Sequence, residues 1–419
     1  MNTWHKLDNA AKLFPAVKAD HNSSTFRVSM IMKETVQRDM LQAAASMAIK
    51  RFPMLAVEMK KGTFWNYLDE PKRTIQIEKE ENYPCYPVTN GSLLRIIYFH
   101  KRISLEIFHG LTDGAGAVEF LKTVAYSYLK MLGHHIEHEN LILLPEDFPD
   151  KEEYEDSYTL YFRPESTNRI MEPKSFQITG TPIEPFGNNV IHGVVSASKL
   201  NEYAKSKGAT ITGYLTAILI RSIYMEYAKN QKSDRKVMIA VPVSLRKSFP
   251  SKTIRNFFSV MNIGTELTEQ TSFDTLLMEV MKQLTEKTNK KALEQSVSPN
   301  VRLEKELWIR FIPLFIKHTF LRYSFEHFGD SRKTLTLSNL GKINLPRDMG
   351  KHIERMEAVV YPTAKSPINC GICSINDKLT ITFTRRIMET DAIKHFFRSL
   401  ADQTGLRIEI YSNEWGIKQ

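Results

Sequence analysis

The chain has 419 residues, of which 42% are hydrophobic and 25% are charged, a composition typical of globular domains. Its formal net charge is +10, but the lysines and arginines are spread along the whole chain, which argues against a nucleic-acid partner. A basic balance also suits phosphate-bearing small molecules and acidic carrier proteins. The start of the chain lacks the apolar core of a signal peptide, and no run of about 18 uncharged apolar residues predicts a transmembrane helix.

Helical and strand patterns alternate in the first 133 residues. Apolar residues at helical spacing predict a helix over 34–52, which ends before a proline. Strict alternation predicts a β-hairpin with strands at 94–99 and 102–108. Helical spacing returns over 118–132 and stops at a glycine.

The pattern then fails over about 134–186, where prolines and acidic residues accumulate, and we interpret this stretch as a long surface connection. It divides the chain into an N-terminal half at 1–150, a crossover linker at 151–186 and a C-terminal half at 187–419. The second half is expected to contain a largely buried helix at 210–228. Its expected strands lie at 190–196, 236–245, 256–263, 334–338, 368–375 and 378–384.

The richest chemistry lies in the corner between the strand at 102–108 and the helix that follows. His109 continues the apolar face of that strand, so its ring is expected to point inward. A neutral imidazole takes a proton from an alcohol, amine or thiol near neutral pH, which makes His109 a candidate general base. Asp113 either orients this ring as a dyad or pairs with a distant cation and fixes the loop. Without catalysis, His109 is a strand-end histidine and Asp113 caps the next helix.

Four further segments accompany this corner. They are Trp4-His5-Lys6-Leu7-Asp8-Asn9-Ala10-Ala11, Val241-Pro242-Val243-Ser244-Leu245-Arg246 with Asn256-Phe257-Phe258-Ser259, and Leu337-Ser338-Asn339-Leu340-Gly341. Together with His109-Gly110-Leu111-Thr112-Asp113-Gly114, they resemble the superfamily of CoA-dependent acyltransferases. That superfamily includes chloramphenicol acetyltransferase, alcohol acetyltransferases and the condensation domains of nonribosomal peptide synthetases.

The resemblance implies an α/β fold of two similar chloramphenicol-acetyltransferase-like halves, a pseudo-dimer with a tunnel between them. It implies that His109 is the base for transfer of an acyl group, most simply acetyl, from a CoA thioester to an alcohol or amine. Asp113 and Gly114 are then structural, and Arg246 is the best-placed partner for the carboxylate, with Arg255 second. No permanently bound cofactor is implied, since acyl-CoA is a co-substrate, and a monomer is consistent with a site made by one chain.

Ser338 and Asn339 are candidates for oxyanion donors or for the tunnel wall, because an acyl-transfer base needs such donors nearby. The same sequence is also simply a good turn.

Two alternative functions stay open. One is a condensation-type enzyme that takes its acyl group from an acyl carrier protein. Phe108 weakens this alternative, because many condensation domains carry a second histidine at that position. The other is a catalytically silent relative that binds small molecules or partners. The Asp-Phe-Gly-Trp-Gly segment of plant-type acyltransferases does not occur in the sequence.

Cysteines and clustered histidines invite other interpretations that the spacing does not favour. Three cysteines are too few for a disulfide framework and are typical of a reducing compartment, so we expect a cytoplasmic protein. Cys370 and Cys373 are three residues apart in a strand pattern, so their side chains point to opposite faces and are expected in the core. His134, His135 and His138 have no evident fourth ligand, so no metal is expected.

The most hydrophobic stretch is 307–322. Arg310 and Lys317 share one face of the helix it predicts, with large apolar residues around the rest. Such a segment either touches a membrane surface or lines an acyl tunnel. We favour a third interpretation, a buried helix kinked at Pro313.

Overall fold

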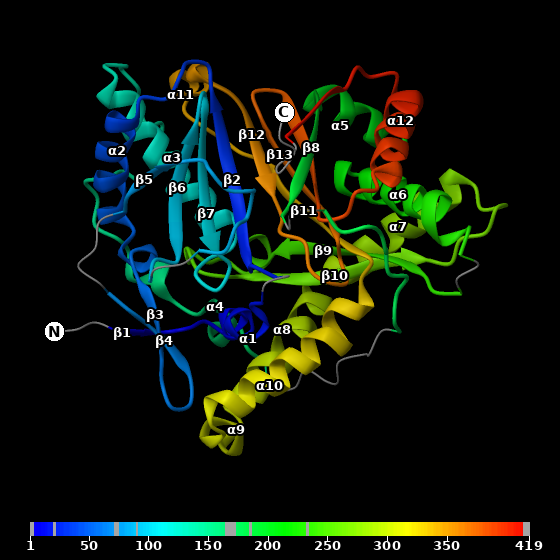
Figure 1. The fold of residues 1–419 in the computed structure, drawn as a ribbon, viewed down its shortest axis with the longest axis horizontal. Coiled ribbons are helices and arrows are strands. Elements are labelled where there is room, and N and C mark those ends of the chain that lie inside the picture. The colour runs from blue at the N-terminus through cyan, green and yellow to red at the C-terminus, as the bar shows by residue number, and fades with distance from the viewer. Residues whose placement is uncertain are drawn as a thin grey trace.

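The structure of the chain is a computed structural model, which describes residues 4–19, 22–70, 75–88, 91–163, 173–183, 187–231 and 234–413. Two large β-sheets lie side by side, each flanked by its own helices (Figure 1). A small third sheet has the strand order β1 (Trp4–Lys6), β4 (Asn66–Asp69) and β3 (Glu58–Lys61).

The N-terminal sheet has five strands. In spatial order they are β12 (Ile353–Val359), β2 (Thr25–Met32), β7 (Arg102–Phe108), β6 (Leu94–Phe99) and β5 (Ile77–Lys79). Helices α2 (Arg38–Arg51) and α3 (Gly114–Met131) pack on each other and share one apolar core with these strands. Because β7 is the middle strand, the residue that follows it is placed at the centre of this half.

The C-terminal sheet has seven strands. In order they are β10 (Phe258–Thr265), β9 (Val237–Ser244), β11 (Leu335–Lys342), β13 (Ile368–Ile375), β14 (Lys378–Arg385), β8 (Asn189–Ser196) and β15 (Glu409–Asn413). The helices of this half are α5 (Ala197–Ser206), α6 (Ile211–Ile223), α7 (Phe273–Thr288) and α12 (Asp391–Thr404). Helix α6 is nearly all buried, because it packs between α7, α12 and the sheet.

The remaining elements connect these layers. They are η1 (Ala10–Lys12), α1 (Phe14–Val17), η2 (Pro53–Leu55), η3 (Lys151–Tyr154), α4 (Ser157–Leu160), η4 (Tyr224–Ala228), η5 (Leu245–Lys247), α8 (Lys290–Lys305), α9 (Leu307–Phe311), α10 (Leu314–Ser324), η6 (Phe325–Gly329), η7 (Asp330–Arg332) and α11 (Arg347–His352). Helices α8 to α10, yellow in Figure 1, project away from the sheets.

Strand β12 crosses from one half of the sequence to the sheet of the other. It lies well beyond residue 187, yet it pairs antiparallel with β2, for example at Met356 opposite Met30. It also contacts β13 and β14 of the C-terminal sheet. The division between the two sheets therefore does not coincide with a single point in the chain.

The sequence patterns predicted most helices and strands. Where the observed bounds differ from the predicted ones, the backbone conformation at the end of the element explains the difference. The hairpin β6–β7 is confirmed, as are the six second-half strands, within a few residues at their ends. Helix α2 begins at Arg38 rather than near 34, because Gln37 has an extended backbone. The helix expected over 210–228 is α6 followed by a π-helical turn at Tyr224–Ala228.

The interpretation of 134–186 as a surface connection is wrong for part of its length. Glu153 is buried, and its carboxylate accepts two hydrogen bonds from Arg51 at 2.7 and 2.6 Å. Tyr158 is buried as well, and its hydroxyl donates to the backbone of Phe258. Acidic residues mark this segment because several of them pair with cations of both halves, not because the whole segment faces water.

A buried ion-pair network ties the strands of the N-terminal sheet together. Arg27 on β2 contacts Glu106 at 2.8 Å and Glu80 at 2.5 Å. Arg95 also pairs with Glu106, and Arg102 with Glu80. A slip of one residue would separate these buried charges, so the network holds the register of β7.

The cysteine prediction is confirmed. Cys370 and Cys373 are both buried and free, and they belong to two different apolar cores on opposite faces of β13. Burial raises the pKa of both thiols, which favours their neutral form. In the part of the chain that the structure describes, no helix is long and apolar enough to cross a membrane.

Candidate functional site

His109 follows the last residue of β7 and is held there from several sides. Its backbone N–H donates to the carbonyl of Ser24 at 2.8 Å. The imidazole stacks on the ring of Phe14, with centroids 4.4 Å apart and planes 10° from parallel. Phe26 lies 4.9 Å and Phe258 lies 5.4 Å away, centroid to centroid. The ring is thus fixed in an aromatic cage made by both halves of the sequence.

The side chain of Asn256 sets which ring nitrogen carries the proton. Its Oδ1 lies 3.2 Å from Nδ1 of His109, while its Nδ2 lies 3.2 Å from Oδ2 of Asp8. The carboxylate of Asp8 accepts backbone N–H groups on both oxygens, so the amide of Asn256 must donate to it. In this arrangement Oδ1 faces His109 as an acceptor, which favours the tautomer with its proton on Nδ1 and the lone pair on Nε2.

Asp8 is fully buried, which makes it an unusual anchor. Burial raises the pKa of this carboxyl, and the nearby guanidinium of Arg255 opposes that effect. The closest Arg255 atom, Nε, is 3.7 Å from Oδ2 of Asp8. The backbone N–H of Ala11 donates to Oδ1 at 2.7 Å, and that of Asn256 donates to Oδ2 at 3.3 Å. A chain of contacts therefore runs from Arg255 through Asp8 and Asn256 to the imidazole.

Asp113 uses both carboxylate oxygens away from His109. Oδ1 accepts the N–H groups of Ala115 and Gly116 at 3.1 and 3.2 Å, which caps helix α3. Oδ2 accepts a hydrogen bond from Arg246 at 2.7 Å and one from the backbone N–H of Phe257 at 2.9 Å. Of the two arrangements open from the sequence, the carboxylate has the arginine pairing and not the dyad.

Arg246 and Arg255 have different partners. Arg246 donates to the carbonyls of Thr253 and Arg255 besides Asp113, so its guanidinium holds the segment that leads into β10. Arg255 instead donates to the carbonyls of Lys6 and Tyr154. It braces the start of the chain against the crossover segment and does not contact Asp113.

Glycines allow the corner to approach its neighbours closely. A Cβ on Gly114 would lie 2.4 Å from a methyl carbon of Leu340, and one on Gly116 would lie 2.1 Å from the carbonyl oxygen of Ile254. The hydroxyl of Thr112 donates to that same carbonyl. The corner is thus joined to the second half through side chain and backbone together.

Ser338 and Asn339 lie on β11, where the strand bulges before Gly341. Asn339 donates to the hydroxyl of Thr212 at 2.9 Å and accepts the N–H of Gly341 at 2.8 Å, the local bonding of a turn. Leu340 of the same turn packs against Gly114. The turn therefore reaches the corner through a leucine, and Asn339 has its main contacts elsewhere.

The three clustered histidines have separate partners. His134 lies against the ring of His352, His135 pairs with Glu137 on the surface, and His138 accepts the N–H of Asn140. Among residues that the structure describes, no group of three or more metal-ligating side chains comes together.

The environment of His109 predicts how activity depends on pH. Burial lowers the pKa of this imidazole below its ordinary value of 6.5, opposed by its own backbone carbonyl, the charge of Asp113 and Asn256. If neutral His109 is the base, protonation abolishes activity, so kcat/KM falls only at pH values below 6.5. A pH profile of kcat/KM measures this acid limb. A limb centred above 6.5 contradicts the assignment.

Sequence reasoning did not single out Asp8 and Asn256 as functional. Both stand in segments that resembled the superfamily, but a polar residue beside a strand is usually a turn or cap. Asn256 is 147 residues from His109 and Asp8 is 248 residues from Asn256, so only the fold brings them together.

The sequence matches no protein-family model and no curated relative, whereas the fold matches solved structures over nearly its whole length. Polyketide synthase associated protein 5 from Mycobacterium tuberculosis aligns with a TM-score of 0.62 at 12% identity, covering 98% of each chain. TRI101 from F. graminearum, complexed with coenzyme A and deoxynivalenol, aligns with a TM-score of 0.62 at 9% identity, over 97% of this chain and 99% of its own. The first condensation domain of the CDA synthetase aligns with a TM-score of 0.60 at 13% identity, over 96% of each chain.

These likenesses define the class of fold. The chain has the two-lobed α/β fold of TRI101 and of the solved condensation domains, which confirms the α/β pseudo-dimer expected from the sequence, while the tunnel between the halves stays a prediction. At 9 to 13% identity the likeness extends to the fold alone.

Proposed function

We propose that this chain is an acyltransferase that moves an acyl group from a CoA thioester to an alcohol or amine, with His109 as general base. The observation that carries this proposal is the contact between Asn256 Oδ1 and His109 Nδ1 at 3.2 Å. A histidine kept neutral by burial, with Nδ1 protonated, has a lone pair on Nε2 for a substrate proton. Binding of coenzyme A by TRI101, which shares this fold, supports the choice of donor.

The proposed reaction balances without any further reagent. Nε2 of His109 takes the proton of the acceptor hydroxyl or amine as that atom attacks the thioester carbonyl. The tetrahedral intermediate collapses, the carbon–sulfur bond breaks, and the imidazolium returns its proton to the leaving thiolate. The products are the acylated acceptor and free CoA, and His109 is again neutral.

The other sequence-derived residues have supporting roles in this proposal. Asp113, Gly114 and Arg246 hold the corner in shape, since the carboxylate both caps α3 and pairs with the arginine. Ser338 and Asn339, which lie on β11, remain our candidates for stabilising the oxyanion or lining the substrate path. The intact pairing at Asp113 counts against a catalytically silent relative.

Purified protein incubated with acetyl-CoA or longer acyl-CoA and a panel of alcohols and amines tests the proposal. We expect acceptor-dependent release of free CoA thiol and a matching acylated product by mass spectrometry. A parallel incubation with acyl-carrier protein separates the condensation-type alternative, which the likeness to the CDA synthetase domain keeps in view. Transfer from the carrier alone would replace CoA as donor, and transfer from neither would overturn the proposal.

Replacing Asn256 by alanine is expected to lower kcat about two- to thirteenfold with little change in KM. This range corresponds to about 0.5–1.5 kcal/mol for the hydrogen bond that fixes the tautomer. Because the amide oxygen favours the charged ring, its loss also moves the acid limb of kcat/KM to lower pH. Steady-state kinetics across pH measure both effects.

Val260→Ala is the matched control, because Val260 lies on β10, four residues after Asn256, and its side chain is exposed. It should change neither kcat nor the acid limb. If Asn256→Ala lowers only the amount of folded protein and leaves the limb in place, then Asn256 has a structural role alone.

A further inference from the structure

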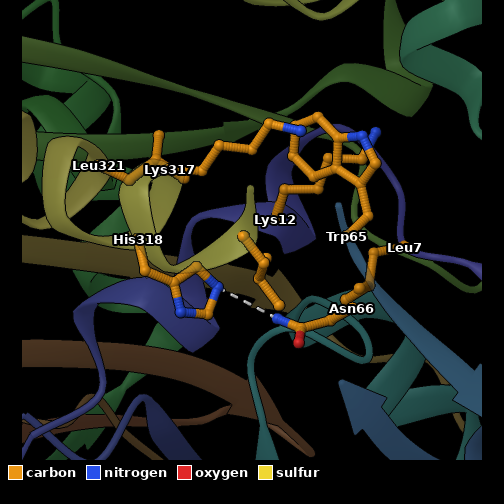
Figure 2. A pocket seen from close by; sticks show the side chains of 8 residues that line it. Leu7, Lys12, Trp65, Asn66, Lys317, His318 and Leu321 are labelled. Carbon is orange, nitrogen blue, oxygen red and sulfur yellow. Dashed lines mark hydrogen bonds between the residues drawn. The ribbon is translucent and has the colours of Figure 1, made fainter. Parts of the chain in front are cut away.

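Helix α10 is held against the protein by one of its faces. Residues at spacings of three and four along the helix line a small pocket together with the β3–β4 hairpin and η1 (Figure 2). These helix residues are Leu314, Lys317, His318 and Leu321. Spacing of this kind places all of them on one side of a helix.

Specific bonds fix the rotation of the helix about its axis. Nζ of Lys317 donates to the carbonyl of Phe64 at 3.0 Å and lies 3.7 Å from the ring centroid of Trp65. Burial lowers the pKa of this amine to about 8. The ring of His318 lies 3.3 Å from the amide of Asn66, as the dashed line in Figure 2 shows. The opposite face of α10 therefore points away from the protein.

That opposite face is apolar and exposed. Phe315, Ile316, Phe320 and Tyr323 all lie on it, and α9 adds Trp308 and Phe311. The four residues Trp308, Phe311, Phe315 and Phe320 are each 66 to 71% exposed. The expectation of a buried helix kinked at Pro313 is wrong, because Pro313 separates two helices whose large side chains face solvent. Large exposed aromatic side chains gathered on two successive helices mark a candidate interaction surface.

Every charged side chain in the same segment is a cation. Residues 307–325 contain Arg310, Lys317 and Arg322 and no aspartate or glutamate. Arg310 and Arg322 are exposed, and Arg322 also donates to the carbonyl of Ala16, which anchors the helix further. A membrane with anionic lipids offers apolar tails beneath negatively charged head groups, so it complements exposed aromatic side chains with arginines beside them. The net charge of +10 also favours binding to an anionic surface.

We propose that the exposed face of α9 and α10 docks this protein on an anionic lipid surface. The two helices have five and eleven residues, too short to span a bilayer but suited to lie in its interface. They project from the body of the molecule, away from the two large sheets (Figure 1). This inference is independent of the acyl-transfer proposal, because it uses none of the residues around His109.

Co-sedimentation of the full chain with vesicles tests the proposal. We expect binding to vesicles of phosphatidylcholine with phosphatidylserine, weaker binding to phosphatidylcholine alone, and loss of the difference at high salt. Trp308 should shift its emission to the blue on binding. The chain contains four tryptophans, so the signal of Trp308 is taken as the difference from a Trp308→Phe variant.

Variants distinguish lipid binding by this face from nonspecific adsorption of the protein to vesicles. The double variant Phe315→Ser/Phe320→Ser should lose binding, and Arg310→Gln should weaken it about fivefold, the effect of one cation at an anionic surface. The matched control is Phe148→Ser/Met278→Ser, because both side chains are exposed elsewhere on the protein. It should bind like the unchanged chain, and all variants should melt alike.

Three outcomes would overturn the proposal. The first is failure of the unchanged protein to bind anionic vesicles. The second is undiminished binding by Phe315→Ser/Phe320→Ser. The third is a dimer in sedimentation velocity that the same double variant dissociates, because the face would then be covered by a second copy of the chain. Acyl-transfer activity in the absence of lipid is expected to be equal in all these variants, which keeps the two proposals separable.

Discussion

Replacing His109 by glutamine is expected to lower kcat/KM for acyl transfer by about 10²- to 10⁴-fold, the usual contribution of a general base. Glutamine fills similar space between the rings of Phe14 and Phe258, but its amide does not accept a proton near neutral pH. The stacked ring and its contact with Asn256 are lost, so a modest drop in melting temperature accompanies the loss of activity. Release of CoA thiol under saturating donor measures the first effect, and thermal unfolding measures the second.

His192 provides a matched control for this variant. It is also a buried histidine whose pKa is lowered by burial, and its Nδ1 contacts the hydroxyl of Thr382 at 2.9 Å. It lies on β8, outside the corner around His109. His192→Gln should therefore retain activity per folded molecule, whatever its stability. Full acyl transfer by folded His109→Gln protein would refute the proposed base.

The helices and strands that have a clear local pattern were predictable from the sequence. Which strands pair with each other across the sheets was not. Alternation located β6 and β7, and its phase placed His109 on the inner face, because a strand has a fixed period of two. Nothing local in β12 indicates that it pairs with β2, more than 300 residues earlier. Such a pairing depends on which sheet edge is free after the rest of the chain has folded.

Helix α10 shows a second limit of sequence patterns. A run of large apolar residues with three cations favoured a buried helix over one that faces a lipid surface, because the pattern alone does not show which face is covered. Lys317 and His318 determine which face of α10 points toward the protein, because they hydrogen-bond to a hairpin some 250 residues earlier in the chain. Polar side chains thus turned the helix so that its aromatic face points outward.

The candidate site also contains residues that the sequence indicated and residues that it did not. The residue types at the corner indicated a base and a carboxylate, and the resemblance to a superfamily suggested Arg246 as partner. The contact of Asn256 with Nδ1 of His109 was not predictable from the sequence, because it depends on how buried Asp8 orients the side-chain amide of Asn256. Long-range polar contacts of this kind follow from the fold and leave no periodic signal in the sequence.

Replacing Asp113 by asparagine is expected to lower the free energy of unfolding by about 1–3 kcal/mol, the usual cost of leaving a buried hydrogen-bonding group without its partner. Asparagine retains a single acceptor oxygen, so it either caps α3 or faces Arg246 and the N–H of Phe257. In either orientation, the NH₂ group of asparagine faces the N–H donors on the other side, with which it forms no hydrogen bond. Denaturant unfolding followed by circular dichroism measures the loss.

A double-mutant cycle shows whether the effect comes from the pair itself. Arg246→Met removes the unpaired cation, so Asp113→Asn/Arg246→Met should be less destabilised than the sum of the single variants. Lys252→Met is the exposed control, because Lys252 also pairs with a carboxylate of the first half, Asp150, but in water. Its melting temperature should hardly change, since exposed ion pairs contribute little. If Asp113→Asn melts like Lys252→Met, or if the double variant shows simple additivity, then the Asp113–Arg246 pair does not hold the two halves of the site together.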